Sequence, residues 1–490
     1  MNGPIRHLAM TLFVAFALLV GVVTWIQVVR GPEYRDDPRN ARVVTARAGR
    51  ERGTIITADG VVVAASQADG SDARLWERTY PEGDLYGHVV GYSTVLFGST
   101  GLEASQSVAL VSDRDSTISG VLNAMLGGDL RPKGLRLTLR NDLQQAASAA
   151  LGDQQGAVVA IDPETGGVLA MVSNPGFDPN DLRGMGAGPA GTALDEDPAQ
   201  PLLNRASEQT YNPGSTFKVV TSAAGMDSGI AGPGTEFADV EALALPGSTA
   251  TIRNFSRDVC EDGDLVTLSV ALVRSCNTVF GSLGLDLGAE ALVDQAEAFG
   301  FNEEPAADFP TTASFIPSVD DFAGDLAAVA QTAIGERDVR ATPLQMALVA
   351  AAVANGGDLM EPFVVDEIFG ADGTVESSTT PAVTRRAMSP ASATSLAEMM
   401  ERVVTGGTGT AAAVPGVRVA GKTGTAEVPG DAPHAWFIGF GPVQGGGDEP
   451  GIAIAVLVEN GGAVGEDATG GAVAAPIAKA VLDVFFGAGS

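Results

Sequence analysis

A continuous run of uncharged, mostly apolar residues, Leu8 to Val29, stands near the start of the chain. At the helical rise per residue this run makes a helix of about 33 Å, which is long enough to cross a bilayer. No cleavage site of the A-x-A type follows, because Arg30-Gly31-Pro32-Glu33 comes next. The pattern predicts an uncleaved membrane anchor over residues 1–29, with a cleaved signal peptide as the alternative.

Short apolar runs typical of β-strands follow in residues 30–135. Residues 53–56 and 61–64 flank Asp59-Gly60, a dipeptide typical of a tight hairpin turn. No catalytic motif is recognisable in residues 30–135. We therefore predict a β-rich, noncatalytic pedestal.

From residue 136 to residue 490, strand patterns stand at both ends and helical patterns lie between them. Strands are predicted near 135–139, 156–161, 168–172, 418–421, 436–440 and 452–458. Helices are predicted at 142–151, capped by Asp142, at 471–486, and through most of residues 200–410. The pattern predicts a mixed α/β (α+β) domain with one antiparallel sheet, helices packed on it and a helical subdomain.

Composition narrows the class of protein. A hydrophobic content of 45% with 18% charged residues is typical of a globular chain rather than a disordered one. The net charge of -31 argues against nucleic-acid binding, which needs a basic face.

The chain has too few histidines for a His-rich metal site. Besides His7, ahead of the apolar run, the chain has only His88 and His434, and neither CxxC nor HExxH occurs. We therefore predict no metal site. A Ser-His-Asp triad would depend on one of these two histidines, and no GxSxG context accompanies them. A serine nucleophile would more readily use a lysine as its base.

Lysine is rare, and its placement is informative: only four of the 29 basic residues are lysines. Lysine can lose its proton near neutral pH when it is buried, whereas arginine cannot. Lys218 ends the motif Ser215-Thr216-Phe217-Lys218 after an Asn-Pro-Gly turn. A helix starting at Ser215 would place both side chains on one face, where a neutral Lys218 could take the proton of Ser215. Alone, this spacing more often marks an ordinary solvated helix face.

Two further motifs complete an ordered set. Ser275-Cys276-Asn277 follows a predicted helix over 265–272 and would present a hydroxyl and a carboxamide. Lys422-Thr423-Gly424-Thr425 continues a predicted edge strand, to which a peptide could add as an extra strand. Alone, each motif is weak evidence for catalysis, because SxN more often marks an ordinary turn and KTG more often marks an ordinary edge strand. Together, SxxK, SxN and KTG form the serine acyl-transferase set of penicillin-binding proteins and serine β-lactamases.

Cys260 and Cys276 form an even pair. In an exported protein they could form a disulfide that braces the SxN turn, with two buried free thiols as the alternative.

The arginines near the anchor and the acyl-transferase motifs point to opposite orientations across the membrane. Seven arginines follow the apolar run and only Arg6 precedes it, which by the positive-inside rule would place the large domain in the cytoplasm. Because large domains can translocate despite such charges, we base the predicted orientation on the acyl-transferase motifs instead. We expect a single-pass membrane protein with its catalytic domain outside.

Over nearly its full length the chain resembles class B penicillin-binding proteins, the monofunctional peptidoglycan transpeptidases. Arg52-Gly53-Thr54-Ile55 is similar to their amino-terminal signature, and Gly101-Leu102-Glu103 is similar to a pedestal motif. Asn204-Arg205-Ala206 ahead of the SxxK motif matches closely. The Cys within SxN and the compact length resemble the actinobacterial A-type subgroup. Ile334-Gly335-Glu336-Arg337 departs from the Gly-Gln-Gly stretch of many relatives.

The resemblance implies a transpeptidase fold with a five-stranded antiparallel sheet, and a D,D-transpeptidase activity that cross-links stem peptides. Ser215 would be the nucleophile, Lys218 its base, Ser275 a proton relay, and Asn277 the holder of the donor amide. Lys422, Thr423 and Thr425 would bind the terminal carboxylate beside Gly424. No cofactor is implied. A SEDS-type glycan polymerase is an implied partner, and β-lactams are implied inhibitors.

Alternatives remain at this point. A β-lactamase shares the motifs but gives no reason for a pedestal and an anchor. A D,D-carboxypeptidase would pass the acyl group to water. A β-lactam sensor would need a cytoplasmic output domain. A noncatalytic scaffold of wall-synthesis complexes is the alternative from another class.

Overall fold

The computed structural model describes residues 2–30, 50–68, 76–94, 96–111, 131–184, 186–443 and 451–488. Four of the arginines that follow the apolar run, Arg35, Arg39, Arg42 and Arg47, lie outside these described residues.

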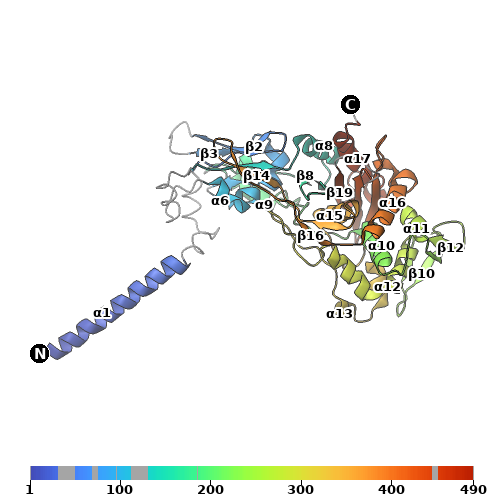
Figure 1. Ribbon diagram of the computed structural model, residues 1–490, viewed down its shortest axis with the longest axis horizontal. Coiled ribbons are helices and arrows are strands. Elements are labelled where there is room, and N and C mark those ends of the chain that lie inside the picture. Colours follow the sequence, from blue (N-terminus) through green and yellow to red (C-terminus); the bar gives the residue numbers. More distant parts are fainter. Residues whose placement is uncertain are drawn as a thin grey trace.

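The apolar run forms one long helix, α1 (Asn2–Trp25), followed by a π-helical turn over Ile26–Arg30. It stands apart from the body of the protein in Figure 1. Residues Gly3–Trp25 have a mean hydropathy of 2.3, and none of the most apolar stretch is buried. Large side chains such as Phe13 and Phe16 are exposed, a surface that suits lipid rather than water. Its length and composition fit a single membrane span.

The pedestal is built on a six-stranded sheet in the order β15-β14-β6-β1-β2-β3. The predicted hairpin joins β1 (Ile55–Ile56) to β2 (Val62–Ala68), and Gly60 adopts a φ of 85° at its turn. The other strands are β3 (Trp76–Thr79), β6 (Gly134–Leu137), β14 (Val365–Phe369) and β15 (Val375–Ser378). Since β14 and β15 come from far along the chain, this sheet crosses the predicted boundary near residue 135.

Short elements connect these strands. They are η2 (Gly83–Tyr86), α4 (Gly87–Val90), β4 (Ser93–Thr94), β5 (Gly98–Ser99), α5 (Gly101–Ser105) and α6 (Ser107–Leu110).

The second sheet has five strands, all antiparallel, in the order β17-β18-β19-β7-β8. It joins β7 (Gly156–Ile161) and β8 (Val168–Asn174) to β17 (Ala420–Val428), β18 (Asp431–Gly441) and β19 (Ile452–Val458). The prediction of one five-stranded antiparallel sheet drawn from both ends of this region is therefore confirmed. The strand carrying the KTG motif, β17, lies at the sheet edge.

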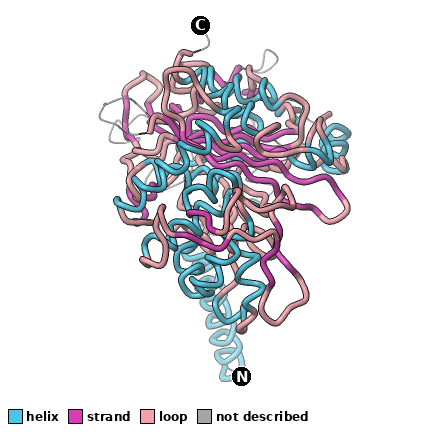
Figure 2. Tube along the Cα trace, turned by 90° about the vertical axis from the view of Figure 1, so that its right-hand side faces the viewer, coloured by secondary structure: helices cyan, strands magenta, loops and turns pink. Residues whose placement is uncertain are grey.

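Helices cover both faces of this sheet (Figure 2). Alternate residues along the strands are buried in two separate cores, as a two-sided sheet requires. α8 (Asn141–Leu151) and α17 (Ala474–Phe485) pack on one face, and α15 (Pro343–Ala354) packs on the other. Asp142 does not cap α8. Instead Asp59 of the pedestal hairpin accepts the Asn141 N–H at 3.2 Å, which ties the pedestal to this helix.

The middle of the chain is helical, with short strands that the sequence patterns did not reveal. Its helices are α10 (Lys218–Asp227), α11 (Leu268–Arg274), α12 (Asn277–Ala298), α13 (Val319–Phe322), α14 (Leu326–Thr332) and α16 (Pro390–Gly406). Strands β9 (Glu236–Ala238), β10 (Ala242–Ala244), β11 (Thr251–Arg253), β12 (Leu265–Thr267), β13 (Asp358–Met360) and β16 (Val383–Arg386) form two-stranded pairs. The helix predicted from residue 265 therefore starts three residues later, because Thr267 caps it by accepting the Val270 N–H.

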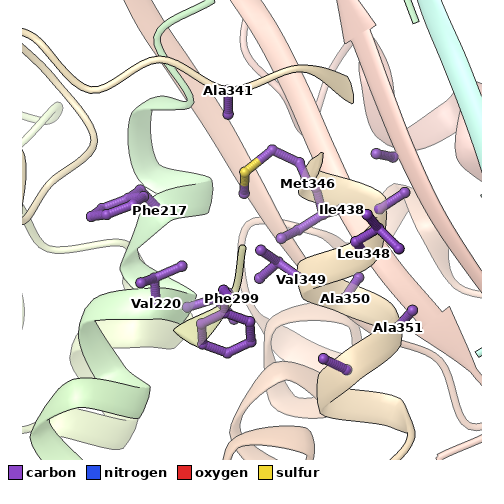
Figure 3. Close-up of a cluster of buried hydrophobic side chains, with 14 of the residues drawn as sticks. Phe217, Val220, Phe299, Ala341, Met346, Leu348, Val349, Ala350, Ala351 and Ile438 are labelled. Carbon is purple, nitrogen blue, oxygen red and sulfur yellow. The ribbon is translucent and has the colours of Figure 1, made fainter. Parts of the chain in front are cut away.

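The helix that carries the SxxK motif is held by the central core. Figure 3 draws Phe217 and Val220 in one buried cluster with Met346 and Val349 of α15 and with Ile438 of β18. All five side chains are buried. This packing fixes the start of α10 against the sheet and so positions the residues around Ser215.

Candidate active site

Ser215 lies in a tight turn between the central helix and the edge strand. Residues Gly214–Phe217 form a 3-10 turn, and α10 begins at Lys218, so the predicted helix starts three residues after Ser215. Gly214 has a φ of 51°, and its N–H donates to the Gly335 carbonyl at 2.9 Å. The Ser215 side chain remains half-buried, and therefore reachable from a cleft.

Lys218 is fully buried and bonded to the SxN turn. Its Nζ donates to the Asn277 Oδ1 at 2.6 Å and to the Ser275 carbonyl at 2.8 Å, and it lies 3.4 Å from Ser275 Oγ. Burial, together with the nearby Lys422 charge, holds the Lys218 pKa well below 10.5, against a smaller opposing effect of Glu336. Within the described residues, no hydrogen bond joins Lys218 to Ser215 Oγ. Such catalytic contacts often tighten only when substrate binds.

Ser275 has an unusual backbone that aims the SxN motif into the site. It ends α11 in the left-handed conformation, with φ 64° and ψ 43°, which is costly for a residue with a side chain. Asn277 then starts α12, and its Nδ2 donates to the Arg253 carbonyl at 2.9 Å. Both ends of the Asn277 carboxamide are therefore engaged.

Cys260 and Cys276 are joined as a disulfide, with their Cα atoms 5.7 Å apart. Because Cys276 stands between Ser275 and Asn277, this link ties the SxN turn to the loop before β12.

The edge strand β17 supplies the second buried lysine. Lys422 Nζ donates to Ser275 Oγ and to the Thr423 carbonyl, both at 2.8 Å. Burial lowers its pKa from 10.5 to about 7. Thr423 Oγ1 shares a 2.6 Å hydrogen bond with Thr408 Oγ1, while the half-buried Thr425 lies next along the same strand.

Gly424 allows the Ser215 turn to sit directly on this strand. A Cβ at Gly424 would lie 2.9 Å from Thr216 Cγ2 and 3.0 Å from the Pro213 carbonyl oxygen. Lys218 of SxxK and Lys422 of KTG both reach the Ser275 Oγ of SxN, so all three motifs meet at this hydroxyl.

His434 and Trp436 contribute packing. The His434 ring lies edge-on to Tyr211 at 5.3 Å, and Trp436 Nε1 donates to the Asn212 carbonyl at 3.0 Å. Burial lowers the pKa of His434.

Sequence reasoning missed Glu336 as a site residue. Burial and the nearby Glu427 raise its pKa to about 7, and its charge acts on Lys218. The one signal was the departure of this segment from the Gly-Gln-Gly stretch of similar proteins.

Comparison with known protein families agrees with this geometry. Residues 156–483 match the model of the penicillin binding protein transpeptidase domain. Residues 52–134 match the penicillin binding protein A dimerisation domain.

Individual relatives extend the match to almost the whole chain. The chain is 40% identical to the peptidoglycan D,D-transpeptidase PbpA of Mycolicibacterium smegmatis, with 98% of each chain covered. It is also 40% identical to PbpA of Mycobacterium tuberculosis, with 99% of each covered.

Solved structures agree as well. Penicillin-binding protein A from M. tuberculosis, in its ceftriaxone acyl-enzyme complex, superposes with a TM-score of 0.82 at 38% identity, covering 90% of this chain and 99% of that one. Its imipenem acyl-enzyme complex gives a TM-score of 0.80 at 39% identity, covering 89% and 99%. With its three motifs gathered around one hydroxyl and its full length matched, this chain belongs to the penicillin-binding protein family and carries that family's transpeptidase domain.

Proposed function

We propose that this protein is a membrane-anchored peptidoglycan D,D-transpeptidase that works through an acyl-enzyme on Ser215. The observation that carries the proposal is the Ser275 hydroxyl, which lies between two buried lysines, Lys218 and Lys422, beside the Ser215 turn. Two relatives that match along nearly their whole length bear the name D,D-transpeptidase, and solved relatives are β-lactam acyl-enzymes.

In the first step, Ser215 Oγ attacks the carbonyl between the two terminal D-alanines of a stem peptide. Neutral Lys218 takes the serine proton, since its burial favours the uncharged amine. Ser275, in hydrogen-bond contact with Lys422 and within 3.4 Å of Lys218, passes a proton to the departing D-alanine nitrogen.

The donor peptide would add to the free edge of β17 as an extra strand. Lys422, Thr423 and Thr425 would bind its terminal carboxylate. The backbone N–H groups of Ser215 and Thr425 would stabilise the developing oxyanion, a contribution of about 3–4 kcal/mol in enzymes of this kind. Asn277 would hold the donor amide after exchanging one of its two present partners, Lys218 or the Arg253 carbonyl.

In the second step, an amine of a neighbouring stem attacks the ester, which forms the cross-link and frees Ser215. A β-lactam would mimic the D-Ala-D-Ala end and leave Ser215 acylated.

We place residues 1–29 as the anchor, 30–135 as the pedestal and 136–490 as the transpeptidase domain on the outer side of the membrane, where peptidoglycan lies. A SEDS-type glycan polymerase is the partner we propose, because a cross-linking enzyme needs newly made strands beside it.

The test is product analysis with the full-length protein in detergent, a stem pentapeptide donor and an amine acceptor. We expect D-alanine release together with a cross-linked dimer, and neither product with Ser215→Ala. Release of D-alanine with only a hydrolysed stem, even at high acceptor concentration, would instead identify a carboxypeptidase.

A further inference from the structure

Thr408 lies outside the three motifs, yet its side chain is bonded to the KTG strand. Its Oγ1 stands 2.6 Å from the Oγ1 of Thr423, a contact in which either hydroxyl can be the donor. Thr408 is exposed, whereas Thr423 is only 6% exposed. An exposed residue therefore contacts the nearly buried hydroxyl to which we assign the terminal carboxylate of the donor peptide.

The backbone of Thr408 is held against the helix that leads into the SxN motif. Thr408 follows α16, and its N–H donates to the Val273 carbonyl at 3.4 Å, two residues before Ser275. A Cβ at Gly407 would lie 2.6 Å from the same carbonyl oxygen, so the loop passes close to the end of α11. The loop that carries Thr408 is therefore tied to the SxN turn.

A second loop packs against both threonines. A Cβ at Gly471 would lie 2.4 Å from the Thr408 carbonyl oxygen and 3.8 Å from Thr423 Cγ2. Thr423 is itself fixed by its pairing with Phe437 in the sheet. Because a threonine side chain has few χ1 rotamers, the two hydroxyls are held in contact by the backbones on either side.

The direction of this hydrogen bond matters for a carboxylate ligand. An ionised carboxylate only accepts hydrogen bonds, so Thr423 must give its single hydroxyl proton to it. The Thr423 oxygen can then only accept from Thr408, which must be the donor. The opposite direction would spend the Thr423 proton inside the protein and turn its lone pairs toward the carboxylate.

We propose that Thr408 is a positioning residue, which donates to Thr423 Oγ1 and so directs the Thr423 proton to the terminal carboxylate of the donor peptide. This inference rests on the proposed function, in which Thr423 binds that carboxylate. Each donor in such a chain polarises the next, which strengthens the bond to the charged acceptor. Thr408 thereby favours donors that end in a free carboxylate, without touching the substrate.

A neutral carboxamide in place of the carboxylate separates this role from simple packing. Its oxygen accepts and its NH₂ group donates, so it can pair with Thr423 in either direction of the Thr408–Thr423 bond. Loss of the Thr408 hydroxyl should therefore weaken reaction with an acid donor more than reaction with the matching amide donor.

The experiment compares two thioester donors on the full-length protein in detergent. Both carry the same N-acyl-D-alanyl group. The leaving group is thioglycolic acid in one and thioglycolamide in the other, and release of the thiol gives kcat/KM for each. The wild type should prefer the acid.

Three substitutions at Thr408 test the hydroxyl itself. Thr408→Val keeps the shape of the side chain without its donor, and we expect the acid-to-amide ratio of kcat/KM to fall about tenfold, as for one hydrogen bond that supports a charged partner. Thr408→Ala removes the same donor and should lower the ratio similarly. Thr408→Ser restores the donor and should recover most of the wild-type ratio.

Two further variants make the test specific. Thr405→Val, at an exposed threonine in the last turn of α16, should keep the wild-type ratio. Thr423→Val should lower the ratio, and adding Thr408→Val to it should lower the ratio no further, because Thr408 acts through the Thr423 hydroxyl. The melting temperature of each variant shows that it is folded.

The outcomes separate the inference from the proposed function. An unchanged ratio in Thr408→Val, no recovery in Thr408→Ser, or an additive loss in the double variant would overturn the inference. A wild type that is acylated equally well by both thioesters would overturn it too. A wild type that reacts with neither thioester would instead refute the proposed function.

Discussion

The side-chain amines of Lys218 and Lys422 converge on one hydroxyl, at 3.4 Å and 2.8 Å from Ser275 Oγ. Both lysines are fully buried, and burial lowers the pKa of each. Two ammonium charges could hardly coexist at this spacing without water. The site therefore favours a state in which at least one lysine is neutral and can accept a proton.

Acylation should accordingly depend on pH. Because the proposed base, Lys218, works as the neutral amine, we expect the rate constant for penicillin acylation to fall about tenfold per pH unit below the lowered pKa of Lys218 and to level off above it. Lys218→Arg should abolish acylation, since a guanidinium keeps its proton. Lys479→Arg, at a surface lysine paired with Asp483, is the control. A rate constant that does not change with pH anywhere in the range in which the protein stays folded would contradict a titrating lysine base.

Gly335 should be intolerant of any side chain. It has a φ of 82°, and an added Cβ would lie 1.9 Å from the Gly214 oxygen, directly behind Ser215. We expect Gly335→Ala to slow acylation strongly and to lower the melting temperature.

Gly324→Ala provides the matched control for this substitution. Gly324 has nearly the same φ, 80°, but open space around it, so its replacement should cost only about 1–2 kcal/mol of backbone strain. Equal losses of stability and acylation in the two variants would show that the close approach to Gly214 is unimportant.

The Cys260–Cys276 disulfide should be present in the native protein and should stabilise it. Maleimide labelling of the native protein should find no free thiol, and labelling after reduction should find two. Cys260→Ser should lower the free energy of unfolding by about 3 kcal/mol, the value for a loop of this length, and should slow acylation by loosening Ser275. Two thiols reacting without reductant would rule the disulfide out.

The pedestal depends on a buried ionic triad. Glu103 accepts from Arg52 Nε at 2.6 Å and from Arg78 Nε at 2.5 Å, and its side chain is fully buried. Burial alone would raise its pKa, but the two guanidiniums outweigh that effect and lower it. Glu103→Ala would leave both cations unpaired, so we expect a loss of about 3–5 kcal/mol in unfolding free energy.

The control for that substitution is Glu77→Ala. Glu77 is exposed, at 60%, and pairs with Arg183 at 3.5 Å, so its loss should cost less than about 1 kcal/mol. Chemical denaturation measures both variants. Similar small losses would mean that the triad contributes little.

Local pattern was sufficient to predict the sheet and the three motifs. The strands around residues 156–172 and 418–458 are apolar and bounded by turns, and each motif lies within four residues of sequence. Pattern could not predict that β14 pairs with β6 and so brings β15 into the pedestal sheet, because strand pairing across more than 200 residues leaves no local signal.

The finer geometry of the site also lay beyond the sequence. Nothing local marks Ser275 for the left-handed conformation, which depends on how α11 and α12 pack. The prediction that Asp142 caps α8 was wrong, because Asp59 of the pedestal hairpin accepts the hydrogen bond at the start of this helix. Glu336 gains its raised pKa only from burial and neighbours brought together by folding.

The most direct test of the central claim is the intact mass of the full-length protein after exposure to penicillin. The wild type should gain the mass of one drug molecule. Ser215→Ala should gain none, and Ser228→Ala, at an exposed serine directly after the end of α10, should behave as wild type. An unmodified folded wild type, or an adduct that persists in Ser215→Ala, would contradict Ser215 as the nucleophile.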